Sequence, residues 1–176
     1  EIDLPKNITL LQEILSYVGY CYNELGLDEE AIAYYNKSLA IAINLSDSVE
    51  IAIGHYNISN SQLKLGQLEN AMQNLSVAYT IDVSRKDTSA IGFDLNAMGY
   101  AQLITGNAQK AINYYKESID LLHQSSGNQS SLGTRYNNLG KAYMSLQKWD
   151  SANVYIKKSI VEHEKNADSL NLVERW

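Results

Sequence analysis

Large apolar residues and small residues recur along the chain at fixed positions about forty residues apart. The large residues form two columns: Leu11, Ile51, Ile91, Leu132 and Val18, Ile58, Met98, Leu139. The small residues form two further columns: Gly19, Ser59, Gly99, Gly140 and Cys21, Ser61, Ala101, Ala142. Together they predict an inward-facing apolar stripe on a helix whose small residues let a neighbouring helix approach closely. Cys21 is therefore interpreted as a packing residue.

Each recurring unit is predicted to contain two helices joined by a short turn. We predict first helices over 8–25, 48–65, 88–105 and 129–146, and second helices over 28–45, 68–85, 108–124 and 149–165. Gly26, Gly66 and Gly106 stand between the helices of the first three units, where a left-handed residue ends a helix. Gln147 takes this place in the fourth unit, which predicts a more strained turn. Polar residues able to cap each following first helix recur at Asn7, Asp47, Asp87 and Asp168.

Comparing the chain with itself confirms this period. The segment AIAYYNKSL from Ala31 and the segment AINYYKESI from Ala111 share five of nine residues at a separation of 80. Ala71 and Ala152 open the corresponding segments of the other units, so the steps are 40, 40 and 41 residues. We predict one solenoid over 1–176 with repeats at about 8–47, 48–87, 88–128 and 129–167. The extra residue falls at Gly127-Asn128, in a linker between units.

The motifs of these units resemble those of the tetratricopeptide repeat (TPR) family. The matching stretches are VGYCYNELGLDEEAIAYY, ISNSQLKLGQLENAMQNL, MGYAQLITGNAQKAINYY and LGKAYMSLQKWDSANVYI. The period exceeds the usual 34 residues, as in the repeats of kinesin light chains and bacterial peptide-sensing regulators. The resemblance implies an all-α, right-handed superhelix of four helical hairpins, with 168–176 starting a fifth because Trp176 follows Tyr136 by forty residues. We therefore expect the chain to be part of a larger protein. One interpretation is that it forms the sensing or interaction part of a bacterial regulatory protein.

Composition and charge narrow the classes of partner. The 176 residues are 45% hydrophobic and 19% charged, which is typical of a folded globular protein. The formal charge of −6 and the absence of a Lys and Arg cluster argue against direct nucleic-acid binding. No run of about 18 apolar residues and no signal peptide is seen, so we expect a soluble chain without membrane contact. Two compartments remain as alternatives, the cytoplasm and the bacterial periplasm, and the cytoplasm is favoured.

Motifs for chemistry are missing from the sequence. A single cysteine excludes an internal disulfide and a cysteine-based zinc site. His55, His123 and His163 fall at unrelated positions of the repeat, without a metal-like spacing, and are interpreted as surface or interhelix histidines. There is no nucleophile elbow, glycine-rich phosphate loop or calcium loop. We expect no catalytic residue, metal or cofactor, and hence no enzyme.

The first helices carry tyrosines and amides on the side opposite the packing stripe, and the family resemblance implies that this side lines a concave groove. The candidate ligand contacts are Tyr20, Tyr56, Asn57, Asn60, Asn96, Tyr100, Asn137, Asn138 and Lys141. Side-chain amides both donate and accept, so a row of them can pair with a peptide backbone. Pockets floored by Leu63, Leu103 and Met144 would then supply specificity. The alternative is that Asn is simply common on this solvated side of the repeat.

Three classes of function are compared. The leading hypothesis is a non-enzymatic module that binds a protein or peptide segment and signals its presence to domains outside this chain. The second is a scaffold that mediates self-association or complex assembly without a discrete ligand. An enzymatic function is the weakest hypothesis, because the sequence contains no motif of catalytic residues.

Overall fold

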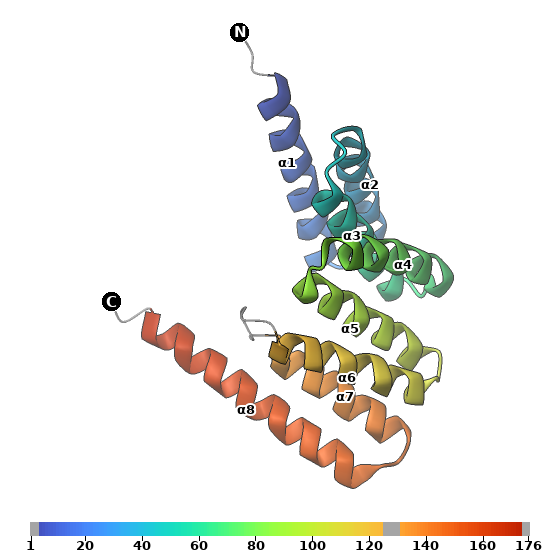
Figure 1. Cartoon of the computed structure of the whole chain (residues 1–176), viewed down its shortest axis with the longest axis vertical. Helices are drawn as coiled ribbons and strands as arrows, with labels where there is room; N and C mark the ends of the chain where they lie inside the picture. The colour runs from blue at the N-terminus through green and yellow to red at the C-terminus, as the bar shows by residue number, and fades with distance from the viewer. Residues whose placement is uncertain (1–3, 125–130, 174–176) are drawn as a thin grey trace. The chain divides into compact units, whose positions relative to one another are not determined.

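The computed structural model describes residues 4–124 and 131–173, with the side chains of 7–124 and 131–166. Eight helices fill these ranges, without a strand in them (Figure 1). They are α1 (Leu4–Glu24), α2 (Asp28–Asn44), α3 (Ser48–Lys64), α4 (Leu68–Arg85), α5 (Thr88–Ile104), α6 (Ala108–Gln124), α7 (Leu132–Ser145) and α8 (Trp149–Val173). The predicted helices are therefore confirmed, mostly to within one to three residues. The insertion at Gly127-Asn128 and the expected aromatic Trp176 lie outside the described residues.

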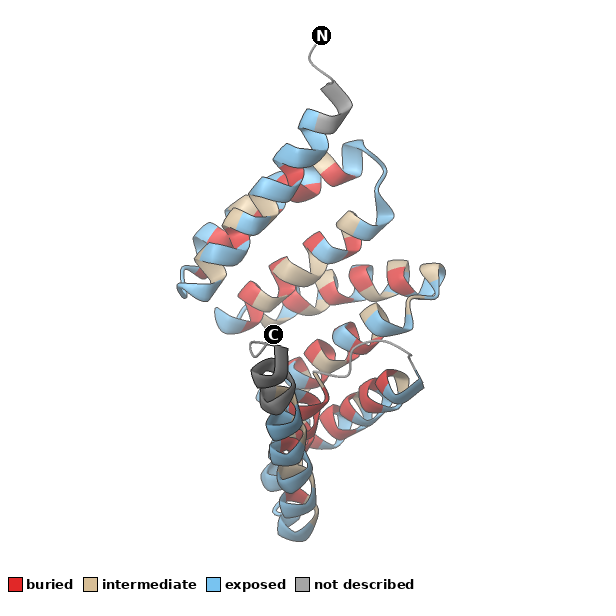
Figure 2. Ribbon diagram, turned by 90° about the vertical axis from the view of Figure 1, so that its left-hand side faces the viewer, coloured by how far each residue is buried: buried red, intermediate tan, exposed pale blue. Residues whose placement is uncertain are grey.

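The helices group into two compact units, residues 1–87 with α1 to α4 and residues 88–176 with α5 to α8. Within each unit every helix packs on the next one along the chain, so that a unit consists of two successive helical hairpins. The division falls between the second and third predicted repeats. Buried residues lie on the sides of the helices that face one another (Figure 2). The predicted all-α class built from helical hairpins is thus confirmed.

A tyrosine ring packed against a glycine fixes the first hairpin of each unit. A Cβ atom added to Gly19 would lie 2.7 Å from Cδ1 of Tyr35, and one added to Gly99 would lie 2.7 Å from Cε1 of Tyr115. Both rings are buried, and burial raises the pKa of Tyr35 to about 12 and also raises the pKa of Tyr115. The small residues predicted at this column are therefore needed for close approach of the two helices.

Buried serines on the second helices bond the backbone of the first helices. Ser38, Ser118 and Ser159 donate to the carbonyl oxygens of Gln12, Gly92 and Gly133, at 3.0, 2.5 and 2.7 Å. Each pair is 26 residues apart, so the bond recurs at the same place in three hairpins. The second hairpin has Ala78 at this column, fully buried and without a hydroxyl.

We expect Ser118→Ala to lower the free energy of unfolding by about 0.5–1.5 kcal/mol, because it removes one buried hydrogen bond and leaves a small void. Urea denaturation followed by circular dichroism at 222 nm measures this. Ser76→Ala, at an exposed position of α4, is the matched control and should change stability little. Equal stabilities of the two variants would show that the Ser118 bond contributes nothing.

The turn inside each hairpin ends the first helix with a left-handed residue. Gly26, Gly66 and Gly106 have φ values of 74°, 73° and 82°, and Gln147 has a φ of 57°. In the fourth hairpin the N–H of Lys148 donates to the carbonyl of Tyr143 at 3.0 Å, the same bond that the glycine turns make. The predicted strain at Gln147 is confirmed, since a residue with a Cβ atom is disfavoured in this conformation.

The capping residues are only partly as predicted. Asp47 does cap α3, because its carboxylate accepts from the N–H groups of Val49 and Glu50 at 3.0 and 3.2 Å. Asn7 and Asp168 begin no helix, since they lie inside α1 and α8. No glycine or proline interrupts the sequence around Asp168, so α8 continues to Val173. The start of a fifth repeat at 168–176 stays a prediction.

Two packing assignments in α1 are wrong. Leu11 is 48% exposed and Cys21 is also exposed, although both fall in columns that are otherwise half-buried or buried. In α3 the corresponding residues contact the hairpin before them: Ile51 packs on the apolar cluster formed with α2, and Ser61 accepts a hydrogen bond from Asn23 of α1. No described helix precedes α1, so its equivalent side chains meet solvent.

Candidate functional site

The first helices of the hairpins lie next to one another within each unit, α1 beside α3 and α5 beside α7. The predicted ligand residues lie on these four helices, and we call this surface the first-helix face. In the first unit it comprises Tyr20, Tyr56, Asn57, Asn60 and Leu63; in the second it comprises Asn96, Tyr100, Leu103, Asn137, Asn138, Lys141 and Met144.

In the first unit Tyr20 is the exposed member of this face, and Lys64, which follows Leu63 on α3, is exposed as well. Tyr20 is 51% exposed, whereas Tyr56, Asn57 and Asn60 are half-buried and Leu63 is buried. The Lys64 ammonium donates to the side-chain oxygen of Asn23 at 2.9 Å. Leu63 therefore presents little surface to a ligand.

Asn23 and Lys64 are residues that sequence reasoning missed. Asn23 donates to Ser61 at 2.8 Å and to Asp28 at 2.8 Å, so it connects α1 with both α3 and α2. Lys64 lies 3.8 Å from the Asp28 carboxylate, an ion pair that is exposed on the lysine side. The sequence spacing could have indicated Asn23 as a candidate. Asn23 follows Tyr20 by three residues, so both lie on the same side of α1.

In the second unit two of the predicted amides meet. The side chain of Asn138 on α7 donates to the side-chain oxygen of Asn96 on α5, at 3.2 Å. This bond uses one of the two N–H groups of Asn138 and one of the two lone pairs of Asn96. The remaining hydrogen-bonding capacity of the two half-buried amides can serve a ligand that lies across α5 and α7.

Exposed side chains surround this amide pair. Tyr100 and Met144 are 41% and 46% exposed, and Lys141 is exposed as well. Asn137 is half-buried, and Leu103 is half-buried because it packs against the apolar core of the unit. Aromatic, thioether and cationic surface is thus available beside the amides, which is a combination suited to binding a protein segment.

Phe93 and Arg135 extend the same side of the second unit and were not predicted. Phe93 lies three residues before Asn96 on α5 and is 40% exposed. The guanidinium carbon of Arg135 on α7 lies 4.8 Å from the centre of its ring, and Arg135 itself is buried. An arginine stacked in this way holds the ring in place through a cation–π interaction. Its column in the other hairpins contains Ile14, Gly54 and Asp94, so the repeat gave no signal for it.

The described ranges hold no group of side chains suited to bind a metal ion. No three His, Cys, Asp or Glu side chains come together there in a way that could hold a metal ion. Among the described helices, none combines the length and apolar character needed to cross a membrane.

Comparison with known families decides what this arrangement is. Two models described as tetratricopeptide repeat match residues 10–82 and 95–121, which together make up more than half of the chain. The chain belongs to the tetratricopeptide repeat family. TPR domains are in general protein-interaction modules, and this one shares their hairpin architecture. No curated protein sequence matches the TPR chain significantly.

Several solved structures share this TPR fold at low sequence identity. BtubC (BKLC) from P. vanneervenii is 16% identical with a TM-score of 0.76, and the match covers 91% of this chain and 66% of that one. Aspartyl phosphate phosphatase F from Bacillus subtilis is 21% identical with a TM-score of 0.79, over 94% and 43% of the two chains. TPR-like repeats of a kinesin light chain from Podospora anserina are 16% identical with a TM-score of 0.69, over 90% and 76%. The predicted TPR fold is confirmed, and this chain spans less than two thirds of the first two of these structures.

Proposed function

We propose that this TPR chain is a non-enzymatic module that binds an extended peptide or protein segment on its first-helix face. The observation that supports this most directly is the amide pair of Asn96 and Asn138, which bridges α5 and α7 amid exposed Tyr100, Lys141 and Met144. The amides bond the partner's backbone, and the exposed side chains around them select its sequence.

The module belongs, in this proposal, to a longer regulatory or signalling protein. The structures of BtubC and of aspartyl phosphate phosphatase F are both longer than this chain, which spans 66% and 43% of them. The second carries a name that denotes action on a phosphorylated aspartate. A segment bound to the TPR hairpins would then control the remainder of such a protein.

Truncating the amides tests this proposal. Asn96→Ala or Asn137→Ala should each weaken binding several-fold, because losing one backbone contact costs about 0.5–1.5 kcal/mol. The double variant should lose roughly tenfold or more. The measurement is titration calorimetry against a partner captured by the immobilised chain, with circular dichroism as a check of folding. Asn153→Ala on α8, which is exposed and lies on a second helix, is the matched control.

A scaffold is the second candidate, and the exposed apolar side of α1 favours it. Leu10, Leu11, Ile14 and Tyr17 are 53%, 48%, 50% and 67% exposed, which is a large apolar area for one helix. A scaffold would bury this side against another copy or another protein. Unchanged affinity in the double Asn96 and Asn137 variant, with a native fold, would contradict binding on the first-helix face and leave the scaffold as the better explanation.

A further inference from the structure

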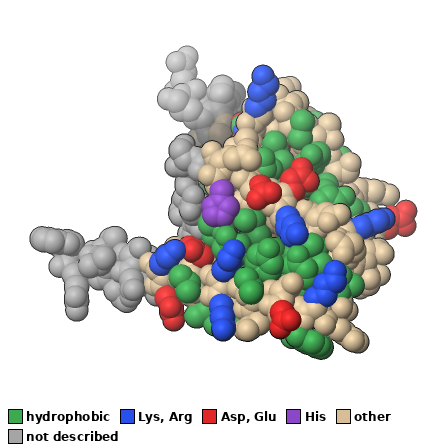
Figure 3. Space-filling view, turned by 60° about the horizontal axis from the view of Figure 1, so that its bottom comes forward, with side chains coloured by type: hydrophobic (Ala, Val, Ile, Leu, Met, Phe, Trp, Pro, Cys, Tyr) green, Lys and Arg blue, Asp and Glu red, His purple; other side chains and the backbone are tan. Residues whose placement is uncertain are grey.

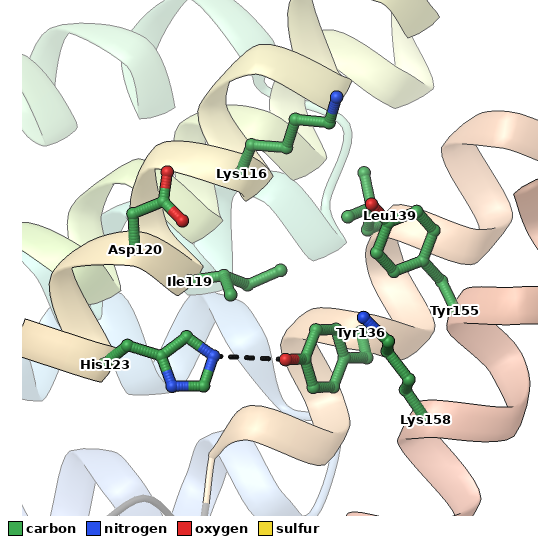
Figure 4. Close-up of a pocket in the computed structure, with 8 residues that line it drawn as sticks. All are labelled: Lys116, Ile119, Asp120, His123, Tyr136, Leu139, Tyr155 and Lys158. Carbon is green, nitrogen blue, oxygen red and sulfur yellow. Dashed lines mark hydrogen bonds between the residues drawn. The ribbon is translucent and has the colours of Figure 1, made fainter.

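A pocket of about 270 Å³ opens in the second unit, and it shares no residue with the first-helix face. It is lined by side chains from α6, α7 and α8 (Figure 4): Lys116, Ile119, Asp120, His123, Tyr136, Leu139, Tyr155 and Lys158. The α6 residues recur at three- and four-residue spacing, so they share one side of that helix. Ile119 and Leu139 are buried, whereas both lysines and His123 are exposed. The pocket therefore has an apolar floor and a polar rim.

Three tyrosines form a row of rings beside the pocket. The rings of Tyr143 and Tyr155 are stacked with their centres 5.4 Å apart and their planes 2° from parallel. Tyr136 follows, with its ring centre 6.1 Å from that of Tyr155. Because the row joins α7 to α8 and is packed against the apolar core, the aromatic wall is already in place before a ligand binds.

The two lysines lie over this row from opposite helices. The ammonium of Lys158 is 5.3 Å from the ring centre of Tyr155 and 5.5 Å from that of Tyr136. The ammonium of Lys116 is 5.9 Å from the ring centre of Tyr143, and a hydrogen bond to Tyr143 raises the pKa of Lys116. Cation–π contacts hold both ammonium groups near the pocket, and they leave N–H donors able to bond an incoming group.

His123 and Tyr136 complete the polar side. Nε2 of His123 and the hydroxyl oxygen of Tyr136 are 3.1 Å apart, and the dashed line in Figure 4 marks this contact. Burial raises the pKa of Tyr136, so its hydroxyl keeps its proton at neutral pH. Two lysines, a tyrosine hydroxyl and an imidazole therefore face one small space.

The acidic groups nearby offset this positive charge only in part, since Asp120 acts electrostatically on Lys116 and Glu162 acts on Tyr136. Glu162 is paired with Lys165 at 2.7 Å, and no ion pair joins Asp120 to either lysine within the described residues. Two lysines against one unpaired aspartate give a local positive charge on a chain whose formal charge is −6. On the surface seen in Figure 3, Lys and Arg side chains stand among hydrophobic ones, with Asp and Glu side chains between them.

We propose that this pocket binds an anionic group, a carboxylate or a phosphate, carried by a protein segment. A cationic ligand is disfavoured, because lysine ammonium groups already lie over the ring faces that would attract it. A protein segment is the expected carrier, since the chain is a TPR interaction module. The pocket is lined by the second helices α6 and α8 and by Tyr136 and Leu139 of α7. None of its residues belongs to the first-helix face, so the proposal does not depend on binding there.

Three capped peptides test the proposal: acetyl-tetraglutamate amide, its tetraglutamine analogue, and a glutamine peptide with one phosphoserine. The probe is the change in methyl NMR signals of Ile119 and Leu139 on titration. We expect the glutamate or the phosphoserine peptide to shift both signals saturably, with the glutamine peptide inactive. The tighter of the two anionic peptides identifies whether a carboxylate or a phosphate is preferred.

Lysine variants localise the binding. Lys116→Gln and Lys158→Gln should each weaken it roughly three- to tenfold, because a charge-assisted hydrogen bond is lost from a partly screened site. Lys110→Gln on α6 and Lys157→Gln on α8 change the net charge equally at exposed positions outside the pocket, and should bind as the unaltered chain does. The proposal is overturned if neither anionic peptide shifts the two methyl signals, or if the control variants weaken binding as much as the pocket variants.

Discussion

Tyr115→Ala should lower the free energy of unfolding by about 3–5 kcal/mol, the largest single loss that we expect in this chain. The Tyr115 ring is fully buried, fills the space beside Gly99 and belongs to the apolar core of the second unit. Truncation would remove this packing and leave a cavity between α5 and α6. Urea denaturation of the whole chain, followed by circular dichroism at 222 nm, gives the difference.

Tyr115→Phe is the matched control for that experiment. The Tyr115 hydroxyl is buried and has no hydrogen-bond partner in the described part of the chain. Removing it should therefore leave stability unchanged or slightly raised, because no bond is lost and a desolvated polar group disappears. A Phe variant as unstable as the Ala variant would show that the hydroxyl, and not the packing of the ring, holds the hairpin.

Ala111→Leu is expected to lower the free energy of unfolding by roughly 1–3 kcal/mol, through the opposite defect of overpacking. Ala111 is fully buried in the same core cluster as Tyr115, and it belongs to the alanine column that lies three residues after the start of each second helix. Gln109→Leu, two residues earlier and exposed, adds a leucine to α6 without filling a packed space. Equal melting temperatures for the two leucine variants would show that the alanine column is not a close-contact position.

The hairpins were predictable because their packing repeats with the sequence. Gly19 meets Tyr35 as Gly99 meets Tyr115, so the same pair of columns specifies the same close approach in both units. The glycine turns also repeat, because the backbone must adopt a left-handed conformation where each first helix ends. A period of forty residues is therefore enough to define the helices and their partners.

Residues whose surroundings depend on a neighbouring hairpin were less predictable. Leu11 and Cys21 share columns with packed residues, but they are exposed because no described helix precedes α1. The residues of the candidate first-helix face could be assigned to their helices from the sequence, whereas the Asn96 and Asn138 bond depends on how α5 lies beside α7. That geometry is set by side-chain packing, which the periodicity alone does not specify.

The anionic-group pocket could not be predicted from the repeat. Leu139 does belong to a repeating apolar column, but Asp120 and His123 do not recur. The positions equivalent to Asp120 in the first two hairpins are Ala40 and Thr80, and those equivalent to His123 are Ile43 and Val83. Each histidine, considered alone in the sequence, is consistent with a residue on the protein surface. Only the packing of three helices brings His123 to Tyr136 and both lysines to one row of rings.

The tyrosine ring beside Gly99 also determines how the first hairpin of the second unit can move. Sliding α5 along α6 by one helical turn, about 5.4 Å, would bring Leu95 or Leu103 to the place of Gly99. Neither leaves room for the Tyr115 ring, so the two helices cannot shift axially past each other. We therefore expect the hairpin to move as one rigid body, so that a displacement of α5 would be accompanied by a displacement of α6.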